Sequence, residues 1–182
     1  MMIWERGWNA LRTAFGFRRK GTWISLSTRF GETWYRKVPK HSEINWPKFI
    51  AFGKELVGKP YRLGAEVNIH DILKSQNPAD IKEIDCSELV EVLFRLVGVP
   101  VPDGSYNQFK VSRPVIGDLL IGDLGFKWNP ENQVVHHVGV WIDGAVLEAK
   151  GKAFGVILTP RESYERSSHF AGWRRLNAIA DA

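Results

Sequence analysis

Apolar residues in the first third of the chain recur mainly at helical spacing. Residues 3–17 place one every three or four positions, which predicts a short amphipathic helix, and residues 23–30 (WISLSTRF) predict a strand. A second helix is predicted over residues 46–57. Asn45 can cap this helix, and Pro47 suits its first turn, where a missing N–H costs nothing.

The strongest helical signal starts at Cys86. A continuous apolar stripe predicts a helix from Cys86 to Val97, and Asp85 is a favourable N-cap, so Cys86 falls in the first turn. The preceding residues, 65–84, are polar and irregular, which predicts a loop. The stripe of the helix consists of Leu89, Val90, Leu93, Leu96 and Val97.

After Gly98 the pattern changes to alternation and short apolar runs, which are typical of strands. Asp143-Gly144 separates two of these runs and is a strong signal for a two-residue hairpin turn. Helices followed by antiparallel strands define an α+β domain. The predicted strands are residues 118–122, 137–142, 145–149, 154–159 and 170–176.

Length and composition indicate a globular domain. The 182 residues suffice for a real core, and 44% apolar with 25% charged residues is ordinary. No apolar run reaches the ~18 residues that a membrane span needs, so no span is expected. The first residues mix apolar and charged side chains and lack the apolar segment of a secretory signal. We therefore expect no signal peptide and synthesis in the cytoplasm.

The net charge of +5 is concentrated near the start of the chain. Residues 1–40 hold nine Lys or Arg against two Glu, and five of the eight Trp lie before residue 47. We interpret residues 1–44 as a basic, Trp-rich N-terminal extension and residues 45–182 as the main domain. The extension either binds an acidic polymer, a membrane surface or a partner protein, or is a solvated basic face whose Trp residues pack on the core.

Cys86 is the single cysteine, so an intramolecular disulfide and a four-cysteine zinc site are both excluded. A thiolate attacks carbonyl groups, and the N–H groups and partial positive charge of a helix N-terminus stabilise it. The same N–H groups can hold the oxyanion of a tetrahedral intermediate. A nucleophile is therefore predicted at Cys86. Because Cys86 shares a helix face with Leu89, burial in the core remains the alternative.

A nucleophilic cysteine needs a base, and His136 and His137 start a predicted strand. Neighbouring side chains of a strand point to opposite faces, so only one of the two can face Cys86, and periodicity does not choose between them. Pairing across the predicted hairpin brings Glu148 near residues 138–139. A carboxylate there can orient an imidazole, unless Glu148 faces solvent.

Four segments, in the same order, resemble the NlpC-type cysteine peptidases, which are small papain-like cell-wall hydrolases. They are GKPYRLG, DCSELVEVLFRLVGVPVP, IGDLLIG and HHVGVWIDGAVLEAKG, and the resemblance covers roughly residues 46–176. It implies a papain-like fold in which a catalytic cysteine starts a helix packed on an antiparallel sheet. Residues 45–182 would then be the catalytic domain.

The resemblance also implies roles for individual residues. Cys86 would be the nucleophile, His137 the base and Glu148 the residue that orients it, and neither a cofactor nor a metal is expected. The substrate class would be peptidoglycan stem peptides. Oxyanion or substrate contacts would come from Tyr61, Asp85 and Ser87.

The chain departs from the family pattern at three places. Glu88 stands where the family usually has Gly, which would add bulk and charge near the cleft. Glu148 stands where His, Asn or Gln is more common, although a carboxylate can also orient a histidine. The loop at residues 65–83 is longer than expected, so we interpret it as a specificity flap or lid.

The resulting hypothesis is a cell-wall peptidase that acts at the bacterial wall, as a phage lysis enzyme released through a holin or as a tail-associated hydrolase, with an intracellular or specially exported bacterial enzyme as the alternative setting. Residues 1–44 would dock to anionic wall polymer or to phage tail proteins, and no nucleic acid partner is expected. Two alternatives stay open: a non-enzymatic papain-like module for virion assembly or binding, and a related thiol amidase or acyltransferase.

Overall fold

The architecture comes from a computed structural model that describes residues 23–29 and 32–179. The predicted helix at residues 3–17 lies outside the described residues. The helices are α1 (Trp46–Glu55), α2 (Ile69–Ser75), α3 (Cys86–Leu96), α4 (Ser105–Lys110) and α5 (Arg161–Glu165), with short 3-10 helices η1 (His41–Glu43), η2 (Pro78–Asp80) and η3 (Asn177–Ile179). The strands are β1 (Trp23–Arg29), β2 (Glu32–Lys37), β3 (Ser112–Pro114), β4 (Leu124–Trp128), β5 (Val135–Ile142), β6 (Ala145–Ala149), β7 (Val156–Pro160) and β8 (Phe170–Leu176).

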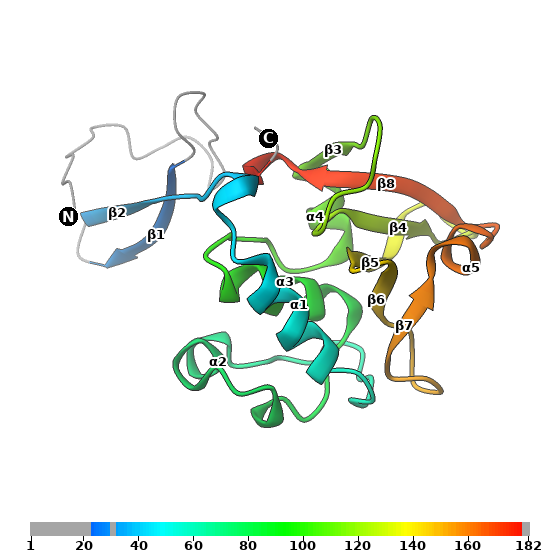
Figure 1. Cartoon of the computed structure of the whole chain (residues 1–182), viewed down its shortest axis with the longest axis horizontal. Helices are drawn as coiled ribbons and strands as arrows, with labels where there is room; N and C mark the ends of the chain where they lie inside the picture. Colours follow the sequence, from blue (N-terminus) through cyan, green and yellow to red (C-terminus); the bar gives the residue numbers. More distant parts are fainter. Residues whose placement is uncertain (1–22, 30–31, 180–182) are drawn as a thin grey trace.

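A six-stranded antiparallel sheet carries the domain, in the order β3-β8-β4-β5-β6-β7 (Figure 1). Strands β5 and β6 form the predicted hairpin. Asp143 and Gly144 both have positive φ, 38° and 86°, as a tight primed turn requires. Separately, β1 and β2 pair as an antiparallel hairpin, which agrees with the predicted strand at residues 23–30.

Helix α3 connects the sheet to the other helices. It packs on β5 and β6, and α1 and α2 in turn contact α3 (Figure 1). All of its residues except Arg95 are buried, and Leu89 and Leu93 have no exposed surface. The predicted helix is therefore confirmed, and its apolar stripe forms the centre of the core.

The core extends into the segment that precedes α1. Val38 and Ile44 are buried in the same cluster as the α3 side chains. Trp46 donates its indole N–H to the His41 carbonyl at 2.9 Å, which fixes the chain as it enters α1. Part of the predicted N-terminal extension thus packs on the main domain, and the boundary at residue 44 stays a prediction.

The predicted strand at 118–122 is wrong, because these residues form a turn before β4. The Asp123 carboxylate accepts a hydrogen bond from the Leu120 N–H at 2.8 Å and closes the turn. Gly122 has φ +91°, and a Cβ there would lie 2.6 Å from the Trp46 ring. The apolar run therefore packs as a turn against α1.

Three short helices were not predicted: α2, α4 and α5. Helix α2 lies inside residues 65–84, which the sequence predicts as a loop, and the Asn68 side chain caps it by accepting from the Asp71 N–H. The predicted strand at 154–159 is shifted, because β7 begins at Val156. None of the described helices combines the length and apolar character that a membrane crossing requires.

The fully buried position of Ile142 at the end of β5 gives a stability prediction. Ile142→Ala leaves a cavity in the core and should lower the free energy of unfolding by about 2–5 kcal/mol in a urea titration. Ile116→Ala removes the same atoms from a side chain that is 96% exposed and is the matched control. Equal effects of the two substitutions would contradict this description of the core.

Candidate active site

Cys86 is a buried free cysteine at the first position of α3. The Asp85 carboxylate caps the helix, because its Oδ1 accepts from the Ser87 N–H at 3.0 Å and from the Glu88 N–H at 2.9 Å. These bonds fix the first turn and place the Cys86 side chain at the positive end of the helix. The predicted cap and the predicted position of Cys86 are both confirmed.

His137 on β5 lies between Cys86 and Glu148. Its Nε2 is 2.7 Å from Glu148 Oε2, and interaction with the Cys86 side chain is among the causes that raise the pKa of its ring. Nδ1 is therefore the nitrogen left to face Cys86. His136 is exposed, whereas the His137 side chain is only 12% exposed. The structure thus brings His137, and not His136, to the predicted nucleophile.

The surroundings of His137 favour its protonated form. Burial alone would lower the pKa of the imidazole, but hydrogen bonds with Cys86 and Glu148, together with their charges, raise it to about 9. An imidazolium next to a cysteine stabilises the thiolate that attacks a carbonyl. The arrangement can therefore supply a nucleophile and a proton donor at neutral pH.

Glu148 on β6 has no exposed surface. Thr159 donates its hydroxyl to Oε1 at 2.6 Å, so both carboxylate oxygens have a donor. Burial raises the pKa of this carboxyl, but the bonds from His137 and Thr159 and the nearby positive charges outweigh burial and lower it. Glu148 is consequently a carboxylate that bonds His137 and does not face solvent, and its role in orienting this histidine stays a prediction.

The predicted substrate contacts lie around the start of α3. Tyr61 forms an isolated parallel bridge with Ile84, and its pKa is raised to about 12 by burial and by the negative charges of Cys86 and Asp85. Its hydroxyl therefore stays a hydrogen-bond donor. Ser87 donates its hydroxyl to Asp85 Oδ1 at 2.9 Å, so these two side chains bond each other. Their contact with substrate stays a prediction.

Two carboxylates at the start of α3 hold the segment that follows Tyr61. Asp85 Oδ2 accepts from the Gly64 N–H and Glu88 Oε1 accepts from the Val67 N–H, each at 3.0 Å. Glu88 is buried and turned toward this segment. The residue that replaces the usual Gly therefore attaches the start of the predicted flap to α3.

The sequence analysis missed Lys127, Thr159 and Tyr164, all of which surround the His137–Glu148 pair. Tyr164 donates its hydroxyl to the Gly125 carbonyl at 2.8 Å, and its ring centre lies 6.4 Å from that of His137. A Cβ at Gly139 would lie 3.1 Å from this ring. The one available signal was therefore the glycine of the His-Val-Gly segment, which leaves room for Tyr164.

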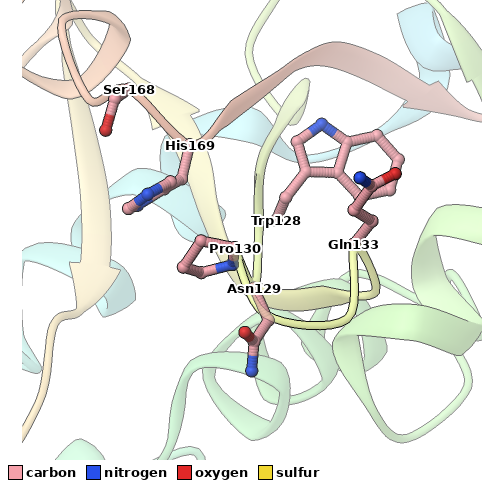
Figure 2. Close-up of a pocket in the computed structure, with 6 residues that line it drawn as sticks. All are labelled: Trp128, Asn129, Pro130, Gln133, Ser168 and His169. Carbon is pink, nitrogen blue, oxygen red and sulfur yellow. The ribbon is translucent and has the colours of Figure 1, made fainter.

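Two hollows lie away from these catalytic candidates. One, of about 300 Å³, lies between the β4–β5 loop and the segment between α5 and β8, and Figure 2 shows the six residues that line it: Trp128, Asn129, Pro130, Gln133, Ser168 and His169. The other, of about 460 Å³, is lined by residues between 62 and 83, the region of the predicted flap. Neither is lined by Cys86, His137 or Glu148.

The fold and site define a class: a helix that starts with cysteine packs on an antiparallel sheet that supplies histidine and a carboxylate, the papain-like arrangement. The model of the NlpC/P60 family matches residues 58–174, and the chain belongs to this family. The predicted family and fold class are thereby confirmed. No curated protein matches the sequence.

Solved structures of similar proteins agree with this assignment. The P60 domain of an antigen from Mycobacterium avium subspecies paratuberculosis is 27% identical, with TM-score 0.54, over 73% of this chain and 93% of that one. The peptidoglycan hydrolase RipB from Mycobacterium tuberculosis is 26% identical, with TM-score 0.52, over 73% and 64%. NlpC1 from Trichomonas vaginalis shares the fold at 16% identity and TM-score 0.57, over 86% and 54%, so the chain spans about half of that protein.

The buried position of Glu88 gives a pH-dependent prediction. Burial raises its pKa, and the hydrogen bond from Val67 offsets only part of this effect. The charges of Glu91, Asp85 and Asp103 also raise the pKa, which moves from 4.5 to about 7. The folded state therefore binds more protons than the unfolded state between these values, and this group adds stability as the pH falls from about 7. Glu88→Gln keeps an acceptor for Val67 but carries no charge.

We expect Glu88→Gln to raise Tm at pH 8, with a difference that shrinks toward pH 5, in thermal unfolding followed by circular dichroism. Glu55→Gln removes one negative charge from an exposed position on α1 and is the control. A Tm difference that is the same at both pH values would show that Glu88 ionises as freely in the folded state as in the unfolded state.

Proposed function

We propose that the protein is a cysteine peptidase that hydrolyses an amide bond in the stem peptides of peptidoglycan. The observation that carries the proposal is His137, which bonds Glu148 through Nε2 and leaves its other nitrogen for Cys86. Family membership and the similarity to a described peptidoglycan hydrolase, RipB, support the substrate class. The reaction is acyl transfer to water, and the side chains at the site suffice for it.

Acylation uses the imidazolium–thiolate pair. The Cys86 thiolate attacks the amide carbonyl carbon, and backbone N–H groups at the start of α3 hold the oxyanion. His137 then gives its Nδ1 proton to the nitrogen of the leaving amine, the C–N bond breaks, and a thioester on Cys86 remains. Tyr61, whose hydroxyl stays protonated because its pKa is raised to about 12, is the side chain proposed to donate to the oxyanion or the substrate.

Deacylation reverses the role of His137. The neutral imidazole takes a proton from water at Nδ1 while the oxygen attacks the thioester, and the C–S bond breaks to release the carboxylic acid and the thiolate. Throughout this step the Nε2–H donates to Glu148, which holds the ring in the tautomer that leaves Nδ1 free.

The proposed setting is the bacterial cell wall, with a phage lysis or tail-associated enzyme as the specific form. Two features support it: the similarity to cell-wall hydrolases and the basic charge of residues 1–40. The extension at residues 1–44 is proposed to dock to anionic wall polymer or to phage tail proteins. Asp85 and Ser87 are proposed to hold the stem peptide next to the nucleophile.

The chain offers a matched pair of histidines for testing the site. Cys86→Ala and His137→Ala should each lower the rate of muropeptide release from purified peptidoglycan by about 10³-fold or more, because each removes a group that reacts. His136→Ala changes the neighbouring exposed histidine and should leave the rate close to that of wild type. Equal release by wild type and Cys86→Ala would sink the catalytic proposal and favour a binding module.

The pKa of His137 also predicts a pH profile. Because this pKa is raised to about 9, the imidazolium persists through neutral pH and is lost above that value. The leaving amine then has no proton donor, so kcat/KM should fall above about pH 9. The measurement is kcat/KM on a soluble muropeptide from pH 6 to 10. A decline that begins below pH 7 would contradict the proposed stabilisation of His137.

A further inference from the structure

Lys127 on β4 is directly opposite His137 in the pairing of β4 with β5 (the strands lie side by side in Figure 1). Its Nζ is 3.6 Å from Glu148 Oε2 and 3.9 Å from the centre of the Tyr164 ring. The side chain is only 16% exposed, and burial lowers its pKa while the Glu148 charge counteracts this effect. A cation so little exposed needs a compensating anion, and the geometry identifies that anion as Glu148.

Few groups stand close enough to balance the negative charge of the Glu148 carboxylate. Thr159 bonds Oε1, and Oε2 is shared between His137 and Lys127. Within residues 23–29 and 32–179, Lys127 is the only Lys or Arg within 4.0 Å of this carboxylate. The other positive group, His137, carries its charge only when it is protonated.

This difference between Lys127 and His137 matters for the proposed reaction, because His137 alternates between imidazolium and neutral imidazole. As imidazolium it compensates Glu148, but as neutral imidazole during deacylation it leaves Lys127 as the remaining cation. A buried carboxylate without a nearby cation is unfavourable. Without the charge of Lys127, the His137–Glu148 pair would therefore retain a proton. A histidine that retains its proton cannot accept one from water.

We propose that Lys127 is a positioning residue that supplies the counter-charge for Glu148 while His137 is neutral and acts as the base. This inference rests on the proposed peptidase function. Glu148 then remains an acceptor for the Nε2–H, and Nδ1 remains free for the proton of the attacking water. The electron pair of Nδ1 takes that proton, and Lys127 itself exchanges none.

The first test needs no substrate. In a Cys86→Ala background, which lacks the thiolate as the acyl-enzyme does, the pKa of His137 is measured by NMR titration of its ring. Adding Lys127→Met should raise this pKa by about one unit, because a positive charge that disfavours the imidazolium is gone. Lys127→Arg should restore it. An unchanged pKa in Lys127→Met overturns the inference, even if the enzyme cleaves peptidoglycan.

The matched control is Lys150→Met, which removes a positive charge from an exposed residue close enough to lower the pKa of Lys127. Its effect on His137 should be clearly smaller than that of Lys127→Met. An equal effect would mean that general surface charge, and not the contact with Glu148, sets the pKa of His137, which also overturns the inference.

The second test is kinetic and uses the Cys86 enzyme. Lys127→Met should lower kcat on a soluble muropeptide about tenfold at pH 7 and shift the acidic limb of the kcat profile upward. In a Glu148→Gln background, where no carboxylate needs compensation, the same substitution should change kcat less than about twofold. Equal losses in both backgrounds would overturn the inference in favour of a role in folding only.

The two tests separate the inference from the proposed function. If wild type releases nothing from peptidoglycan while Lys127→Met still raises the pKa of His137, the substrate proposal fails and the role of Lys127 is supported. If wild type cleaves peptidoglycan and Lys127→Met leaves both the pKa and kcat unchanged, the role of Lys127 fails and the peptidase proposal stands.

Discussion

A hydrogen bond between two little-exposed ionisable side chains, His137 and Glu148, is the interaction on which the site depends. Burial opposes the charge on both groups, yet each stabilises the charge of the other, so the imidazolium and the carboxylate persist together. Their 2.7 Å contact requires β5 and β6 to pair in one register. The turn at Asp143-Gly144, where both residues have positive φ, sets that register. A local turn thus fixes the electrostatics of the site.

The second requirement is the start of α3, where a single carboxylate organises two segments. One oxygen of Asp85 caps the helix that begins with Cys86, and the other accepts from the Gly64 N–H. Glu88 extends the same arrangement by one turn through its bond to the Val67 N–H. Cys86 and the segment that follows Tyr61 are therefore attached to each other by the Asp85 and Glu88 carboxylates at the start of α3.

Features encoded by neighbouring residues were predictable from the sequence. The cap of α3 at Asp85, the position of Cys86 and the hairpin of β5 with β6 all match, because caps and turns depend on a few adjacent residues. The positions of Cys86 at a helix start and of Glu148 near β5 were predictable for the same reason, although the choice of His137 over His136 needed the family resemblance. The strand predicted at 118–122 failed because Asp123 and Trp46 convert an apolar run into a packed turn.

Contacts that depend on distant strands were not predictable. Thr159 reaches Glu148 from β7, Lys127 reaches it from β4, and Tyr164 lies over the sheet from α5. Their sequence separations from one another and from His137 give no period or motif. Only the topology, which places β4, β5, β6 and β7 side by side, brings Lys127 and Thr159 to the same carboxylate. The sequence therefore predicts the candidate residues, whereas the structure shows which charged and polar side chains surround them.

The carboxylate at position 148 has opposite effects on the two halves of the proposed reaction. It raises the pKa of His137, which favours the imidazolium and thus the thiolate that begins acylation. The same stabilisation opposes deacylation, where His137 must be neutral to accept a proton from water. A neutral His, Asn or Gln, which the resemblance indicates as more common at this position, would create less of this conflict. A lysine 3.6 Å from the carboxylate reduces it, because its positive charge stabilises Glu148 without adding a hydrogen bond to the histidine. Glu148 and Lys127 are therefore best understood as one unit, in which the second residue makes the first compatible with both steps.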